Sequence, residues 1–231
     1  MKLNAYFTFL CASFTALSAL AFADNSQQVR SIDIYITPYY SAHGGKVEHV
    51  AVHPELDPLL KSNSVASLKK AIAQVEKEPQ LITPMVMFTL AARSYDLGLR
   101  DDAVFWFYAG RYRLITAMDV LDLPKSSLAE YSSFATLVGK FILPYAFCDH
   151  AKNSKIKRKA LQWVKDHPYQ ALFLAQLPSK QPDRKKALAQ SEKALDKNFQ
   201  ESENYLKDPK KKADFLAKRK AENTDARFCW K

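Results

Sequence analysis

The pattern of apolar and polar positions divides this chain into a short β-rich segment and a long helical region. Residues 31–37 alternate isoleucines with polar residues, which is the period of a half-buried strand. Residues 47–52 are also β-rich, and they follow Gly44-Gly45, which suits a hairpin turn. From residue 62 onward the apolar spacing becomes helical. The pattern predicts a mainly α protein, a helical bundle or short helical array, with a small N-terminal β-hairpin.

Capping residues mark the ends of the first helices. Residues 62–64, Ser-Asn-Ser, offer an N-cap to a helix that Pro79 stops. Thr83 caps a second helix with Pro84 at its first position, where the missing N–H costs nothing. Gly98 suits the left-handed position that closes this helix.

The partner of this second helix is predicted to lie in the middle of the bundle. Asp101 or Asp102 starts it, because a carboxylate is favoured at the positive end of a helix dipole. The run 103–109, AVFWFYA, is apolar on all sides, and we interpret it as core rather than as a cofactor site.

The remaining helices follow from similar signals. A capping box at Ser127-Leu128-Ala129-Glu130 opens a helix that should end before Pro144. The later segments are a helix over 154–166, a short apolar helical segment over 168–177, a surface helix over 183–207 and a last helix capped by Asp208-Pro209.

Residues 83–113 resemble a helix pair of the tetratricopeptide or Sel1-like repeat class. The residues that carry the likeness are Ala91, Ala92, Tyr95, Gly98, Ala103, Trp106, Tyr108 and Ala109. No second or third copy occurs at a fixed period, whereas arrays need about three repeats to be stable. The resemblance implies a protein-binding scaffold without chemistry.

The first 23 residues have the pattern of a secretory signal peptide. Lys2 is followed by an apolar stretch, and Ala21-Phe22-Ala23 forms an A-x-A cleavage site. A membrane anchor is the alternative, but no stop-transfer charges follow. We expect a cleaved signal peptide over 1–23 and a single domain over 24–231, located in the periplasm or secreted, and not transmembrane once processed.

Charge is unevenly distributed along the chain. Residues 1–150 carry 13 Lys and Arg against 14 Asp and Glu, whereas residues 151–231 carry 21 against 10. We therefore distinguish a hairpin region over 24–60, a neutral helical core over 61–150 and a basic helical part over 151–231.

The basic part is either a solubilising face or the binding surface for an anionic partner. Its candidate binding residues are Lys155, Lys157, Arg158, Lys210, Lys211 and Lys212. An acidic protein is the partner we expect first, with anionic lipid or glycan as alternatives. Nucleic acid is not expected, because the aromatic residues lie upstream of the lysines.

Three residues near the apolar run are further binding candidates. Tyr95, Arg111 and Arg113 could line a pocket mouth together. In the alternative interpretation, the two arginines pair with acidic residues at Asp96, Asp101 or Asp102.

Removal of the signal peptide leaves two cysteines, Cys148 and Cys229. Cysteines in an oxidising compartment usually pair, so we predict an intramolecular disulfide between them. Free thiols and intermolecular pairing are the alternatives.

Catalytic and metal-binding patterns are weak. His49 and His53 could share a metal ion only on a helix, whereas their neighbours favour extended chain. Adjacent Cys148, Asp149 and His150 tend to point apart. The sequence contains no G-x-S-x-G and no phosphate-binding glycine loop. We expect no cofactor and no enzymatic activity.

The function that fits these observations is a non-catalytic, exported protein-binding module. One concrete version is an immunity-type periplasmic protein that occludes a toxin. The alternatives are an envelope protein that binds anionic lipid or glycan through its basic third, and an envelope enzyme without a recognisable motif.

Overall fold

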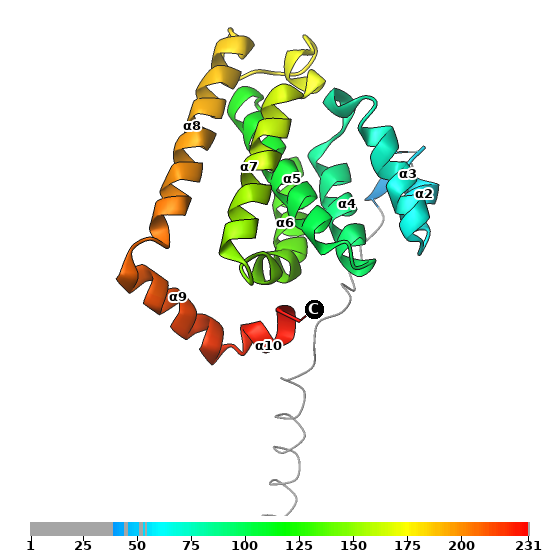
Figure 1. The fold of residues 1–231 in the computed structure, drawn as a ribbon. Helices are drawn as coiled ribbons and strands as arrows, with labels where there is room; N and C mark the ends of the chain where they lie inside the picture. Colours follow the sequence, from blue (N-terminus) through cyan, green and yellow to red (C-terminus); the bar gives the residue numbers. More distant parts are fainter. Residues whose placement is uncertain (1–38, 44–45, 51–52, 54, 231) are drawn as a thin grey trace, which may run out of the picture.

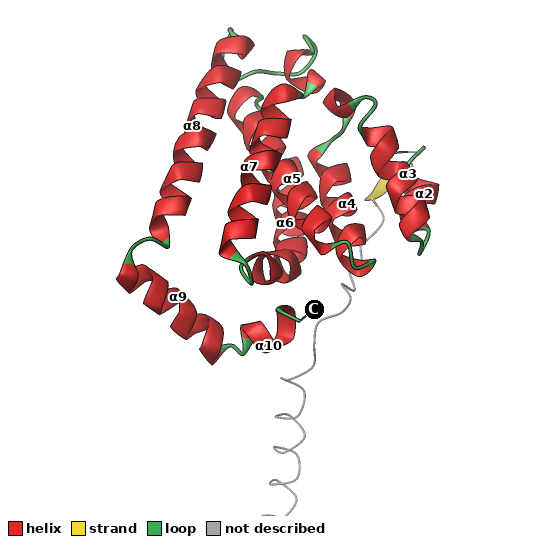
Figure 2. Cartoon of the chain, in the orientation of Figure 1, coloured by secondary structure: helices red, strands yellow, loops and turns green. Residues whose placement is uncertain are grey.

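The computed structural model describes residues 39–43, 46–50, 53 and 55–230. This part of the chain is mainly helical, as predicted (Figure 2). Its elements, in chain order, are β1 (Tyr39–His43), β2 (Lys46–Val50), α2 (Asp57–Lys61), α3 (Val65–Val75), the 3-10 turn η2 (Pro79–Leu81), α4 (Pro84–Asp96), α5 (Arg100–Val120), α6 (Lys125–Ala146), α7 (His150–Asp166), the 3-10 turn η3 (Gln170–Phe173), α8 (Arg184–Tyr205), α9 (Pro209–Ala221) and α10 (Thr224–Phe228).

The two strands pair in antiparallel fashion, with Tyr39 opposite Val50. Strand β2 overlaps the predicted strand over 47–52. The other predicted strand, residues 31–37, lies outside the described residues, as does the predicted signal peptide over 1–23.

Helix α5 lies at the centre of the bundle and packs against α4, α6, α7 and α8 (Figure 1). The apolar run at residues 103–109 explains this position, because each of its faces is covered by another element. Trp106 and Phe107 are each 2% exposed. Gly110 allows α4 to approach closely: a Cβ there would lie 2.9 Å from the ring of Phe88. The prediction that this helix is core is confirmed.

Several predicted helix ends are also confirmed. The side chains of Ser64, Thr83 and Asp208 accept hydrogen bonds from backbone N–H groups in the first turns of α3, α4 and α9. Gly98 has a φ of +80°, the left-handed conformation that glycine adopts most easily.

Other boundaries differ from the prediction. Helix α6 begins at Lys125, so the residues of the expected capping box lie inside it. It also continues through Pro144, because only one backbone donor is lost and Phe147 N donates to Leu143 O at 3.2 Å beyond it. Helix α5 begins at Arg100, which places both aspartates in its first turn rather than at its cap. Within 168–177, only η3 is helical.

One buried side chain ties the centre of the bundle to its loops. Arg113 of α5 is fully buried. Its Nη1 donates to the carbonyls of Pro79 and Ile82 at 2.6 and 2.8 Å, and its Nη2 donates to the carbonyl of His167 at 2.5 Å. The guanidinium therefore joins the loop between α3 and α4 to the end of α7.

Among the described residues, no carboxylate forms an ion pair with Arg113. Burial lowers the pKa of Arg113 to about 10, so the group stays charged at neutral pH. The rings of Trp163 and Tyr169 lie 5.2 and 5.5 Å from the guanidinium carbon and supply cation–π attraction. These aromatic faces and the three carbonyls replace much of the water that burial removes, although Nε of Arg113 is buried without a hydrogen-bond partner among the described residues.

We expect Arg113→Met to lower the free energy of unfolding by about 3 kcal/mol or more, because three carbonyls lose a charged donor. Urea denaturation measures this loss. Arg111→Met is the matched control, since Arg111 is exposed on the same helix and its replacement should change stability by less than about 0.5 kcal/mol. Equal effects of the two substitutions would show that Arg113 does not hold the loops.

Candidate functional site

Helices α8, α9 and α10 form an arch around the bundle, which we call the C-terminal arch (residues 184–228). Helix α8 runs along one side of the bundle, and α9 and α10 pass beneath it in the view of Figure 1. Helix α8 packs on α5 and α7, and α10 packs on α6. These contacts attach the arch to the body at both ends.

The beginning of the arch is fixed by hydrogen bonds and a small second core. Arg184 at the start of α8 donates to the carbonyls of Leu172, Leu174 and Leu177. Buried Leu188 packs in an apolar cluster with residues at the end of α5.

The middle of the arch is held by a mostly buried ion pair. Lys157 of α7 lies 3.1 Å from a carboxylate oxygen of Glu203 on α8, and Ser154 donates a hydrogen bond to the same carboxylate. Lys157 is only 9% exposed. The expectation that it belongs to a free basic surface is therefore wrong: α8 covers it and supplies its partner.

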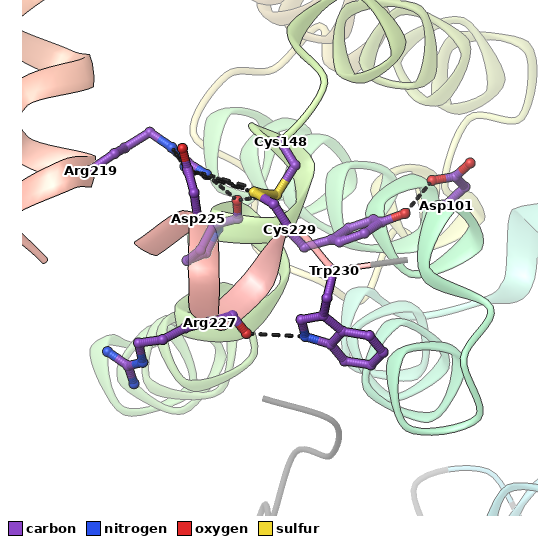
Figure 3. The surroundings of a disulfide bond; sticks show 9 residues. Asp101, Cys148, Arg219, Asp225, Arg227, Cys229 and Trp230 are labelled. Atoms are coloured by element: carbon purple, nitrogen blue, oxygen red, sulfur yellow. Dashed lines mark hydrogen bonds and ion pairs between the residues drawn. A yellow bond between two sulfur atoms is a disulfide. The ribbon is translucent and has the colours of Figure 1, made fainter. Parts of the chain in front are cut away.

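The end of the arch is closed by a disulfide between Cys148 and Cys229, which confirms the predicted pairing (Figure 3). The two Cα atoms lie 5.3 Å apart, within the usual range for a disulfide. Arg219 of α9 lies beside it, 2.6 Å from Asp225, and also donates to the carbonyl of Pro144 at 3.2 Å. The covalent bond and this arginine attach α9 and α10 to the end of α6.

Trp230 continues this closure beyond the disulfide. The guanidinium of Arg100 lies 3.8 Å from the centroid of the Trp230 ring and 4.6 Å from that of Tyr95. The indole N–H of Trp230 donates to the carbonyl of Arg227 at 3.1 Å. The chain end is thus stacked on the turn between α4 and α5.

A polar cluster lies next to this stack. Tyr145 donates to Asp101 at 3.0 Å, and Lys152 lies 3.0 Å from the same carboxylate oxygen. Burial, followed by the hydrogen bond to Asp101, raises the pKa of Tyr145, and the hydrogen bond to Asp101 raises the pKa of Lys152. Both groups are therefore protonated at neutral pH, and their contacts with Asp101 join α5, α6 and α7.

The most distinctive surface of the arch is α9. This helix carries six Lys or Arg residues and one Asp, and only Arg219 among its residues is buried. Lys210, Lys211 and Lys212, which the sequence predicts as binding residues, are exposed. Leu216 of the same helix is 50% exposed, so the surface combines cations with apolar area.

The other sequence-predicted binding residues are not brought together. Tyr95 is fully buried beneath Arg100, and Arg113 binds loop carbonyls, so these two do not line a common pocket mouth with exposed Arg111. Arg113 pairs with none of the acidic residues considered. Lys155 is exposed on α7, and the guanidinium of Arg158 lies 4.5 Å from the ring of Phe199.

The structure also places the candidate metal ligands and the potential nucleophile. His49 lies on β2. The backbone N–H of His53 donates a hydrogen bond to the Asp57 carboxylate at 3.4 Å. Among the described residues, no three His, Cys, Asp or Glu side chains gather in a group that could hold a metal ion. Cys148 is oxidised in the disulfide and Asp149 caps α7, so no free thiol is present at this position.

Two residues that matter for the surface beneath α9 were not among the binding residues predicted from the sequence. Phe147 and Phe215 meet with ring centroids 5.3 Å apart, although they are far apart in the chain. Phe215 could have been noticed in the sequence, because it is a large aromatic residue in an otherwise basic helix. Nothing in the sequence pointed to Phe147 as its partner.

Among the described residues, no helix combines the length and the apolar character needed to cross a membrane.

We expect replacement of both cysteines, in Cys148→Ser/Cys229→Ser, to lower the free energy of unfolding by about 4 kcal/mol, because the crosslink closes a long loop. Urea denaturation measures the change. Reductant should destabilise the wild-type protein to the same level and leave the double variant unaffected. A loss below about 1 kcal/mol would mean that the arch is held without the disulfide.

Acid should loosen the middle of the arch. Burial raises the pKa of Glu203, but hydrogen bonds from Ser154 and Lys157 and the charge of Lys157 outweigh it and lower the pKa overall. The contribution of Glu203 is therefore present above its ordinary pKa of 4.5 and is lost as pH falls through the lower folded value.

We accordingly expect the wild-type protein to lose more stability than Glu203→Gln between about pH 6 and pH 3, as measured by thermal unfolding. Glu201→Gln is the matched control, because Glu201 is exposed on the same helix and should keep the wild-type acid dependence. An acid dependence in Glu203→Gln as steep as that of wild type would contradict this assignment.

Comparison with known proteins finds a similar protein in Haemophilus influenzae. No family model matches the chain, and no solved structure does. An uncharacterized protein of Haemophilus influenzae is 46% identical over 223 residues, which cover 96% of this chain and 87% of that protein. The chain therefore belongs to the same family as this Haemophilus influenzae protein.

Proposed function

We propose that this protein is an exported, non-catalytic binding module that holds an acidic protein partner against helix α9. The observation that carries the proposal is the exposed basic helix itself. Its cations outnumber its acidic residues six to one, and one residue of the helix is buried.

The way in which α9 is held supports a binding role. A helix of 13 residues is marginally stable in isolation, and its like charges repel. Here it is anchored at one end by the Asp208 cap and at the other by Arg219 and the disulfide beside it. A solubilising face would not need such anchoring, whereas a binding surface gains affinity from being rigid before the partner arrives.

A protein partner suits this surface better than a purely charged polymer. Exposed Leu216 and half-buried Phe215 lie among the lysines of α9. Protein interfaces combine aromatic and apolar contacts at their centres with charges at the rim, whereas a polyanionic glycan requires charge alone. A toxin neutralised by occlusion is one narrower form of such a partner.

Export is part of the proposal. The signal-peptide pattern over 1–23 supports it, and so does the Cys148–Cys229 disulfide, since disulfides persist in oxidising compartments. Mass determination of the N-terminus of protein recovered from periplasm should give a chain that starts near Asp24. Recovery of the uncleaved chain from the cytoplasm would contradict it.

Capture from periplasmic extract tests the binding role. The wild-type protein should retain one stoichiometric acidic protein, and Lys210→Glu/Lys211→Glu/Lys212→Glu should weaken retention at least about tenfold. The matched control is Lys185→Glu/Lys186→Glu/Lys193→Glu, which reverses the same charge on exposed positions of α8 and should retain the partner.

Salt provides a second check on this binding. Retention should fall when salt is raised to about 0.5 M, because exposed charges are then screened. Salt-sensitive retention on anionic vesicles or cell wall, with no protein partner, would instead favour the lipid or glycan alternative.

A further inference from the structure

The surface beneath α9 is hollowed on both sides of one aromatic contact. A cavity of about 450 Å³ lies on the α10 side, and its apolar walls include Leu143 and Phe228. A second cavity of about 470 Å³ lies on the α8 side, and its walls include Tyr205 and Leu206. The Phe147–Phe215 pair borders both cavities.

The rim of the first cavity is cationic. Lys140, Lys218, Arg219 and Arg227 border it, with Glu222 as the acidic member. Arg219 is neutralised by Asp225, and Lys218 lies 3.9 Å from Glu222. Lys140 and Arg227 have no ion-pair partner among the described residues. An acidic ligand therefore finds available positive charge at the edge of an apolar hollow.

We propose that the two cavities form one docking groove for an amphipathic acidic helix of a protein partner. One apolar side chain of that helix enters each cavity, on either side of the Phe147–Phe215 pair. Its carboxylates face Lys140 and Arg227 on the rim. The inference rests on the proposed function and assigns the binding mode of the same partner.

The divided floor distinguishes a helix from a lipid chain as the occupant. An extended acyl chain fills one continuous channel, whereas here the apolar surface is divided into two separate cavities that share the Phe147–Phe215 pair, whose ring centroids lie 5.3 Å apart. A helix presents apolar side chains at intervals of three, four or seven residues, so that two of them can straddle a ridge. Two hollows that share the Phe147–Phe215 pair as a common border can each receive one such side chain.

Binding of synthetic peptides to the full chain tests the groove directly. The first probe is a fluorescent acidic peptide with leucines spaced for one face of a helix and glutamates elsewhere. The second has the same composition in an order that scatters the leucines. We expect the amphipathic peptide to bind at least about tenfold more tightly by fluorescence anisotropy, because two leucines are buried only when they share a face.

Variants locate the bound peptide. Tyr205→Ala removes an exposed wall of the second cavity, and Lys140→Glu reverses a rim charge outside α9. Each should weaken the amphipathic peptide at least about fivefold. The matched controls, Phe173→Ala and Lys193→Glu, change exposed residues that border neither cavity and lie outside α9, and they should leave its affinity unchanged.

The contrary outcomes distinguish failure of the docking groove from failure of the proposed binding function. Equal affinity for the two peptides, or wild-type affinity in Tyr205→Ala and Lys140→Glu, would overturn the groove while leaving an electrostatic surface on α9 intact. Failure of the amphipathic peptide to bind up to about 1 mM would also overturn it. Binding to anionic phosphatidylglycerol vesicles that is lost in Tyr205→Ala, without peptide binding, would assign the cavities to lipid. The capture experiment with the α9 triple variant tests the broader function independently.

Discussion

The structure depends on one buried cation, Arg113. A guanidinium without a carboxylate partner would be costly to bury, yet here it donates to three carbonyls and lies against two aromatic rings. The acceptors belong to the loop before α4 and to the end of α7, so the central helix α5 determines the position of both. Helix α7 in turn carries Ser154 and Lys157, which hold Glu203 of α8, so this interaction also contributes to the placement of α8.

The arch combines strong end attachments with a lightly packed middle. A small apolar core fixes the start of α8, Lys157 and Glu203 join α7 to its later turns, and the disulfide closes the far end. Helix α9 adds one buried side chain of its own, Arg219. The five lysines of α9 therefore remain at the surface, in a fixed position, next to two apolar hollows. This combination of rigidity and exposure is the structural basis of the binding role that we propose.

The sequence predicted the features that depend on neighbouring residues, such as helix caps and the apolar run of α5. Caps at Ser64, Thr83 and Asp208 were readable because their partners lie within the first helical turn. The central position of α5 was readable because its apolar run leaves no polar face. The roles of Arg113 and Lys157 were not predictable from the sequence. The sequence shows that these residues are charged, but it does not show which distant group each of them contacts. The exposed lysines of α9 were predicted as surface residues, but the hollows beside them require Phe147 and Phe215 to meet across the fold.

Site-specific photocrosslinking in cells tests the central claim, that α9 is the surface that meets a partner. A photoreactive residue at Lys211 of α9 is compared with one at Lys69, which is exposed on α3. The account predicts one crosslinked acidic protein from position 211 and none from position 69. The same products from both positions, or a crosslink from position 69 alone, would contradict it.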